Sequence, residues 1–139
     1  MVLEMPLDVS IRILLIDDVP AIRSMVRSML TSLGFRRVVE AEDGDQAWET
    51  LQESLVSKAD RFDLVITDWS MPGLSGAELL RAIRSDPRSQ NIPILIVTSH
   101  GDGEHLSEAQ RAGVTQYLVK PFNTDLLKEQ IQKALTKTD

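Results

Sequence analysis

The architecture of this chain follows from one segment, Asp63-Leu64-Val65-Ile66-Thr67-Asp68-Trp69-Ser70-Met71-Pro72-Gly73. Its apolar run, residues 64–66, is short and continuous, as in a strand that is buried on both faces of a sheet. The run ends at Asp68, and Pro72 and Gly73 then break regular structure. Open α/β sheets place their chemistry at the carboxyl ends of such strands, although a single aspartate there is more often a turn or capping residue.

The same alternation of strand and helix extends to both sides of this segment. Apolar runs predict four more strands, at residues 11–16, 38–41, 94–97 and 116–119. Apolar residues at helical spacing predict a helix after each strand. The first runs from Pro20 to a stop at Gly34, the second covers residues 47–55 after a turn at 42–44, and the third lies around residues 79–83 and ends near Asp86-Pro87. The fourth covers residues 104–112 with Gly113 as its cap, and the fifth runs from a cap at Asn123 or Thr124 to Leu135. The pattern predicts an α/β fold, a doubly wound parallel sheet of five strands with helices on both faces.

Length and composition limit the possible classes of protein. A chain of 139 residues fits one domain, which we expect over residues 11–139 behind a tail of residues 1–10, with frayed ends. No apolar run could span a membrane, and the first residues do not resemble a secretory signal. The absence of cysteine favours a reducing, cytoplasmic location. The net charge of −6, with basic residues scattered along the chain, argues against nucleic-acid binding.

Polar residues follow four of the five predicted strands. Asp17-Asp18 follow the first strand, Asp68 the third, Thr98 the fourth and Lys120 the fifth. In a parallel sheet these ends share one edge, where three carboxylates would repel one another unless a cation joins them. Mg²⁺ suits such oxygen ligands, and Lys120 and Thr98 can donate to anionic oxygens. The set predicts a site for Mg²⁺ and a phosphoryl group, with a carboxylate that can accept this group covalently.

Each of these residues also has an ordinary structural interpretation. Asp17-Asp18 could cap the first helix, Thr98 could simply end a strand, and Lys120 could be a solvated surface residue. Tyr117 would then be a packing residue. His100 and His105 are poor candidates for a zinc site, because no cysteine or third histidine completes a ligand set. The occurrence of the acidic, hydroxyl and basic residues together, each at a strand end, favours the site.

These motifs resemble those of a response-regulator receiver domain, over residues 12–135. The resemblance rests on Asp17-Asp18, on Asp68 with Met71-Pro72-Gly73 behind it, on Thr98 and on Lys120-Pro121. The run Asp68-Trp69-Ser70-Met71-Pro72, with Tyr117 three residues before Lys120, is most similar to single-domain, CheY-like receivers of chemotaxis. The resemblance implies a flavodoxin-like sheet with strand order 2-1-3-4-5. It also implies a cis peptide bond between Lys120 and Pro121.

The resemblance further implies a function and a role for each site residue. Asp68 would be the phosphoacceptor, and Mg²⁺ would be held by Asp17, Asp18, Asp68 and the backbone carbonyl of Ser70. Lys120 would contact the phosphoryl group, and Thr98 with Tyr117 would form the switch. The phosphoryl group would come from a histidine kinase. The surface of the fourth helix, fifth strand and fifth helix would then bind a downstream protein, such as a flagellar motor switch.

The resemblance implies a monomeric, stoichiometric phosphoacceptor that assists its own phosphorylation and dephosphorylation, rather than an enzyme. Two alternatives stay open. One is an aspartyl phosphatase of related fold, in which Ser70 would stand where a second aspartate is usual. The other is a receiver that has lost phosphorylation and serves only for docking. The sequence names neither the kinase nor the target. Variable positions Ser70 and His100 leave open the lifetime of the phosphorylated form, and a longer segment at residues 51–61 departs from CheY-like chains.

Overall fold

Five parallel strands form one sheet in the order β2-β1-β3-β4-β5, which confirms the predicted flavodoxin-like topology. The computed structural model describes residues 7–71, 73–99 and 103–136, with side chains from residue 107 onward in the last range. The strands are β1 (Arg12–Ile16), β2 (Arg37–Ala41), β3 (Leu64–Asp68), β4 (Ile94–Thr98) and β5 (Gln116–Val119). The helices are α1 (Pro20–Ser32), α2 (Gly44–Ser54), α3 (Gly76–Ser85), α4 (Gly103–Ala112) and α5 (Thr124–Thr136).

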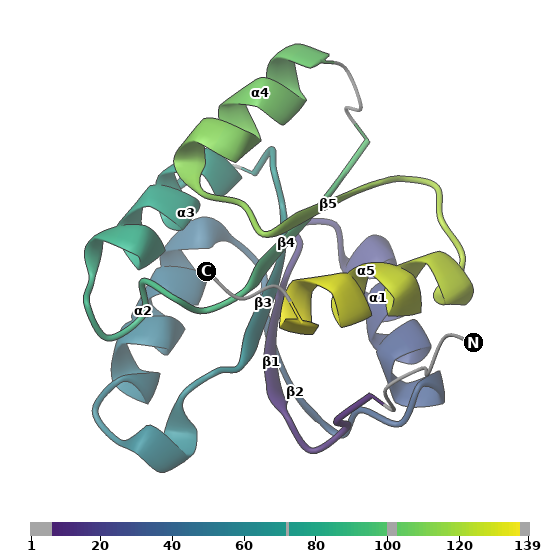
Figure 1. Cartoon of the computed structure of the whole chain (residues 1–139), viewed down its shortest axis with the longest axis horizontal. Coiled ribbons are helices and arrows are strands. Elements are labelled where there is room, and N and C mark those ends of the chain that lie inside the picture. Colours follow the sequence, from purple (N-terminus) through teal and green to yellow (C-terminus); the bar gives the residue numbers. More distant parts are fainter. Residues whose placement is uncertain (1–6, 72, 100–102, 137–139) are drawn as a thin grey trace.

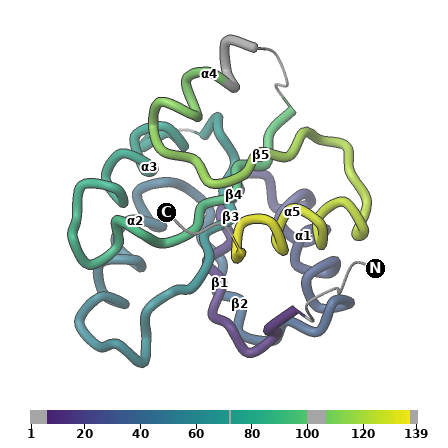
Figure 2. Tube along the Cα trace, viewed as in Figure 1, coloured from purple at the N-terminus to yellow at the C-terminus, as the bar shows by residue number. Residues whose placement is uncertain are grey.

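The helices cover the sheet on both faces (Figure 1). Helices α1 and α5, far apart in the sequence, lie side by side on one face (Figure 2). Their buried residues Val26, Leu30, Leu127 and Ile131 pack there against one set of strand side chains. Helices α2, α3 and α4 cover the other face with a second apolar cluster. The central strands β1, β3 and β4 are therefore buried on both faces, as their continuous apolar runs predict.

The helix ends follow from capping residues, some of which the sequence analysis did not identify. Pro20 begins α1, and Gly34 follows the helix with a φ of +102°, as predicted. The predicted turn at residues 42–44 is wrong in part, because Asp43 accepts a hydrogen bond from the Gln46 N–H and caps α2. Helix α3 begins with a capping box of Ser75 and Glu78.

The N-terminal tail, the segment after α2 and the start of α5 bear on further predictions. Leu7 packs against the α1–α5 side of the core, so the expected fraying does not extend to this part of the tail. Helix α2 ends at Ser54, and the longer segment after it is a loop with one 3₁₀ turn, Lys58–Asp60. Asn123 rather than Thr124 caps α5, accepting from the Leu126 N–H. Predictions for residues 1–6 and 137–139 lie outside the described residues, as do those for Pro72 and His100 and for the His105 side chain.

The described part of the chain contains no helix with both the length and the apolar character to cross a bilayer. The Lys120–Pro121 peptide bond is cis, as predicted.

Candidate functional site

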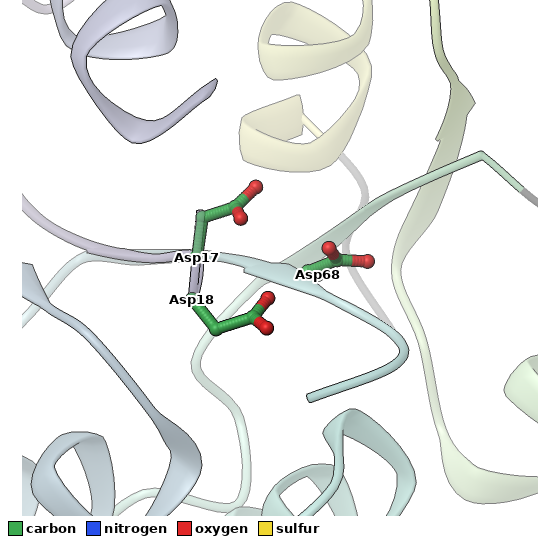
Figure 3. Close-up of side chains that lie close together, drawn as sticks. All are labelled: Asp17, Asp18 and Asp68. Carbon is green, nitrogen blue, oxygen red and sulfur yellow. The ribbon is translucent and has the colours of Figure 1, made fainter. Parts of the chain in front are cut away.

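Three carboxylates meet at the carboxyl edge of the sheet. Asp17 and Asp18 follow β1 directly, and Asp68 is the last residue of its neighbour β3. One oxygen from each carboxylate lies within 4.8 Å of the others (Figure 3). The parallel arrangement of β1 and β3 accounts for this proximity, because it places the ends of both strands at the same edge.

The ammonium group of Lys120 lies between two of these carboxylates. Its Nζ is 3.1 Å from Oδ2 of Asp17 and 3.3 Å from Oδ2 of Asp68. Lys120 follows β5, and its backbone N–H donates to the Thr98 carbonyl at 2.7 Å, so the end of β4 fixes where the lysine leaves the sheet. The side chains of Asp17, Asp68 and Lys120 are only 5%, 12% and 15% exposed, which limits the screening of their charges by water.

Backbone N–H groups bind the remaining oxygens of two of the acids. Oδ1 of Asp17 accepts from the Val19 N–H at 2.9 Å, and Oδ1 of Asp68 accepts from the Trp69 N–H at 2.7 Å. The guanidinium of Arg23 donates to the Asp17 carbonyl at 2.7 Å and so supports the loop after β1. The sequence analysis missed Arg23, whose only signal was a basic residue in the first turn of the following helix.

Burial of Asp68 raises the pKa of its carboxyl group above the ordinary value. The nearby ammonium of Lys120 lowers this pKa, and the negative charge of Asp17 raises it again. The balance indicates that one lysine does not fully offset the cost of placing this carboxylate beside another in a buried site.

The donor set of this edge fits Mg²⁺. Carboxylate oxygens are the hard ligands that this ion takes in proteins, usually one or two of them together with waters and phosphate oxygens. Three carboxylates opposed by one ammonium leave a net charge of −2, which a divalent cation would neutralise. Asp17, Asp18 and Asp68 are therefore able to hold the ion.

The structure brings Thr98 to the same edge. Thr98 is the last residue of β4 and is fully buried. Asp68 is paired with Val97 across the two strands, so Thr98 lies one residue beyond the level of Asp68. Ser70 is exposed in the loop after β3.

Tyr117 lies in β5, paired with Ile96 of β4. It packs against the cluster beneath α2, α3 and α4, and it also lines a cavity of about 290 Å³ with residues of α4 and α5. Alternation along β4 places Thr98 on the same face as Ile96, and hence on the face where Tyr117 packs. The two residues that the resemblance predicts as the switch therefore lie on adjacent strands and on one face of the sheet.

Comparison with known proteins agrees with this arrangement. The family model of the response regulator receiver domain matches residues 13–132. The chemotaxis protein CheY of Pseudomonas aeruginosa is 39% identical over 128 residues, which cover 92% of this chain and 98% of that protein. The structure of the chemotaxis response regulator CheY4 of Vibrio cholerae superposes with a TM-score of 0.81 at 34% identity, covering 91% of this chain and 99% of that one.

A third similar structure is the receiver domain of the sensor histidine kinase PA1611 from Pseudomonas aeruginosa, described with a magnesium ion coordinated in its active-site cleft. It superposes with a TM-score of 0.78 at 27% identity and covers 92% of this chain and 99% of that one. The family match extends over most of the chain, which also has the acidic cluster of Asp17, Asp18 and Asp68. This chain therefore belongs to the response-regulator receiver domains, the phosphorylation-dependent signalling switches of two-component and chemotaxis pathways.

Proposed function

We propose that Asp68 accepts a phosphoryl group from the phosphohistidine of a histidine kinase. A carboxylate oxygen of Asp68 attacks phosphorus, the bond from phosphorus to the histidine nitrogen breaks, and an acyl phosphate forms on Asp68. Water later attacks the same phosphorus, which releases inorganic phosphate and restores the carboxylate. The observation that carries this proposal is the contact of Asp68 with Lys120 at 3.3 Å beside two further carboxylates.

Asp17, Asp18 and Asp68, with the backbone carbonyl of Ser70, are proposed to hold Mg²⁺. The bound ion supplies positive charge to the oxygens of the phosphoryl group during transfer. Lys120, now shared between Asp17 and Asp68, would donate instead to a phosphoryl oxygen. This exchange of partners lets the protein assist its own phosphorylation and dephosphorylation without acting on outside substrates.

Thr98 and Tyr117 are proposed to convert the charge at Asp68 into a change in packing. The Thr98 hydroxyl would donate to a phosphoryl oxygen, and the Tyr117 ring would move into space that this rearrangement opens. The location of both residues on one face of adjacent strands supports the idea. The altered surface of α4, β5 and α5 would then bind a downstream protein differently.

The biological setting is proposed from the relatives. The names of the relatives support a role in chemotaxis. From the receiver family we propose a histidine kinase as the donor and a target such as a flagellar motor switch. We propose that the protein works as a cytoplasmic monomer without direct binding of nucleic acid or membrane. One receiver domain over residues 11–139, behind a tail of residues 1–10, is the corresponding domain assignment.

Mass spectrometry after incubation with acetyl phosphate and Mg²⁺ tests the phosphoacceptor assignment. The wild-type protein should gain one phosphoryl group, and Asp68→Asn should gain none. Full labelling of the variant would show that another residue is the acceptor. Continuous release of phosphate at many turnovers per minute would favour a phosphatase, and an unmodified wild-type protein would favour a docking module.

A further inference from the structure

The first turn of α2 lies directly against the loop that follows Asp68. Oδ2 of Asp45, the second residue of α2, accepts a hydrogen bond from the Leu74 N–H at 3.3 Å. The preceding residue, Gly44, is so close to this loop that a Cβ atom there would lie 1.9 Å from the Leu74 carbonyl oxygen. Only glycine permits this contact, so the helix start and the loop backbone touch without an intervening side chain.

The Asp45 carboxylate lies against the backbone of Gly73 in this loop. Gly73 has a φ of +73°, and a Cβ atom on it would lie 2.4 Å from Oδ2 of Asp45. The carboxylate therefore occupies the space that a side chain at residue 73 would need. Through its hydrogen bond from the Leu74 N–H, this carboxylate joins two segments that are 29 residues apart in the sequence.

The base of the loop is closed where the start of α3 meets the residue that follows β3. The Gly76 N–H donates to the Trp69 carbonyl at 2.9 Å, and a Cβ atom on Gly76 would lie 2.5 Å from the Asp68 carbonyl oxygen. The loop thus has one attachment at its base and one, through Asp45, near its tip. Ser70 lies between them and is itself exposed.

We propose that Asp45 is a positioning residue for the phosphorylation site. By binding the Leu74 N–H, it narrows the conformations of the loop that carries Ser70, the residue whose carbonyl would complete the Mg²⁺ ligands. The inference rests on the proposed function of the site and adds α2 to the elements that build it. Within the described residues, Asp45 makes no hydrogen bond to Asp17, Asp18 or Asp68, so its effect on the site passes through the loop backbone.

The expected loss of Mg²⁺ affinity depends on the fraction of molecules in which the loop has the conformation that binds the ion. When the binding-competent conformation is only partly populated, the apparent Kd for the ligand rises in inverse proportion to that population. Loss of residues that orient metal ligands through hydrogen bonds weakens metal binding by about 10- to 100-fold. Asp45 is one step further from the ion, so we expect removal of its carboxylate to weaken Mg²⁺ binding by about three- to tenfold.

The chain offers a matched control for this test. Asp125 is the second residue of α5, as Asp45 is of α2, and both are exposed acids in a first helical turn. Replacing either with alanine removes the same favourable interaction with the helix dipole. Only Asp45 has a hydrogen bond with the loop after Asp68, so a difference between the two variants reports on the loop rather than on helix stability.

The experiment compares wild type, Asp45→Ala, Asp45→Asn and Asp125→Ala by calorimetric titration with Mg²⁺ alone. Asp45→Ala should bind Mg²⁺ three- to tenfold more weakly, whereas Asp125→Ala should match wild type. Asp45→Asn retains an acceptor oxygen and should recover most of the affinity. An Asp45→Ala affinity within twofold of wild type, or an equal loss in Asp125→Ala, would overturn the inference.

Amide hydrogen exchange of Leu74, measured by NMR without metal, separates this inference from the proposed function. Exchange should accelerate at least threefold in Asp45→Ala and stay unchanged in Asp125→Ala. Unchanged exchange of Leu74 in Asp45→Ala would refute the proposal that Asp45 restricts the loop, whatever the Mg²⁺ titration gives. If wild type itself neither binds Mg²⁺ nor takes up a phosphoryl group, it is the proposed function that fails.

Discussion

Replacing Asp68 with asparagine should stabilise the protein when no divalent ion is present. In the folded protein the Asp68 carboxylate lies beside those of Asp17 and Asp18, whereas in the unfolded chain the third acid is far from the pair. Asparagine has nearly the same shape and can still accept from the Trp69 N–H. The substitution therefore removes a charge without leaving a cavity.

The distances give the expected magnitude. With an effective dielectric constant near 20, repulsion between Asp68 and each of two carboxylates within 4.8 Å is at least about 3.5 kcal/mol. Attraction to Lys120 at 3.3 Å is about 5 kcal/mol on the same scale, which leaves a net cost of about 2 kcal/mol. Rearrangement and water lower this value, so we expect Asp68→Asn to raise the free energy of unfolding by about 1 to 2 kcal/mol.

Urea denaturation at neutral pH in EDTA measures this difference through the midpoint, with unchanged slope. Glu53→Gln, which removes an exposed carboxylate of α2, controls for the general effect of lowering the net negative charge. Excess Mg²⁺ should stabilise wild type more than Asp68→Asn, because only wild type keeps all three acids. A variant less stable than wild type in EDTA would refute the electrostatic argument.

Four further outcomes follow. Burial raises the pKa of Asp68 in the folded state, so the charged form of this residue destabilises the fold only at pH values above that pKa. The increase in the free energy of unfolding caused by Asp68→Asn in EDTA should therefore shrink as the pH falls through the pKa, as measured by urea midpoints at several pH values. Thr98→Ala should still be phosphorylated, but the affinity of a partner should no longer rise with phosphorylation, as measured by calorimetry on both forms. Lys120→Met should lower the rate of phosphorylation by acetyl phosphate at least tenfold, followed by mass spectrometry. Arg84→Met should lower the free energy of unfolding by about 3 kcal/mol, because Arg84 donates to the carbonyls of Gln90, Ile92 and Gly113 and to the hydroxyl of Thr115; a loss below about 1 kcal/mol in urea denaturation would contradict this.

The sequence alone predicts the features that depend on periodicity and on strand ends. Uninterrupted apolar runs at Leu64 and Ile94 identify central strands, because only strands buried on both faces lack polar alternation. Parallel topology then brings Asp17, Asp68 and Lys120 together without knowledge of any distance. The proximity of these side chains could be inferred for that reason.

Contacts between distant loops could not be predicted in this way. The hydrogen bond from the Leu74 N–H to Asp45 depends on how the α2 start approaches the loop, and nothing in the local pattern of either segment specifies it. The hydrogen bonds of Arg84 to three backbone carbonyls could not be predicted either. Every residue has a backbone carbonyl, so the residue types do not indicate which carbonyls an arginine will bind. Capping by Asp43 was missed because a turn and a helix start favour the same residue types.

The two ends of the parallel strands differ in how well they tolerate added chain or an attached group. All the acidic site residues lie at the carboxyl edge, whereas the longer loop after α2 leads into the opposite end of β3. Val56, in this loop, is 84% exposed. Chain added at this point lengthens a surface connection at the edge opposite the site, which costs little in loop-closure entropy. A fluorophore or affinity tag attached at Val56 should therefore report on the protein, or immobilise it, without disturbing phosphorylation.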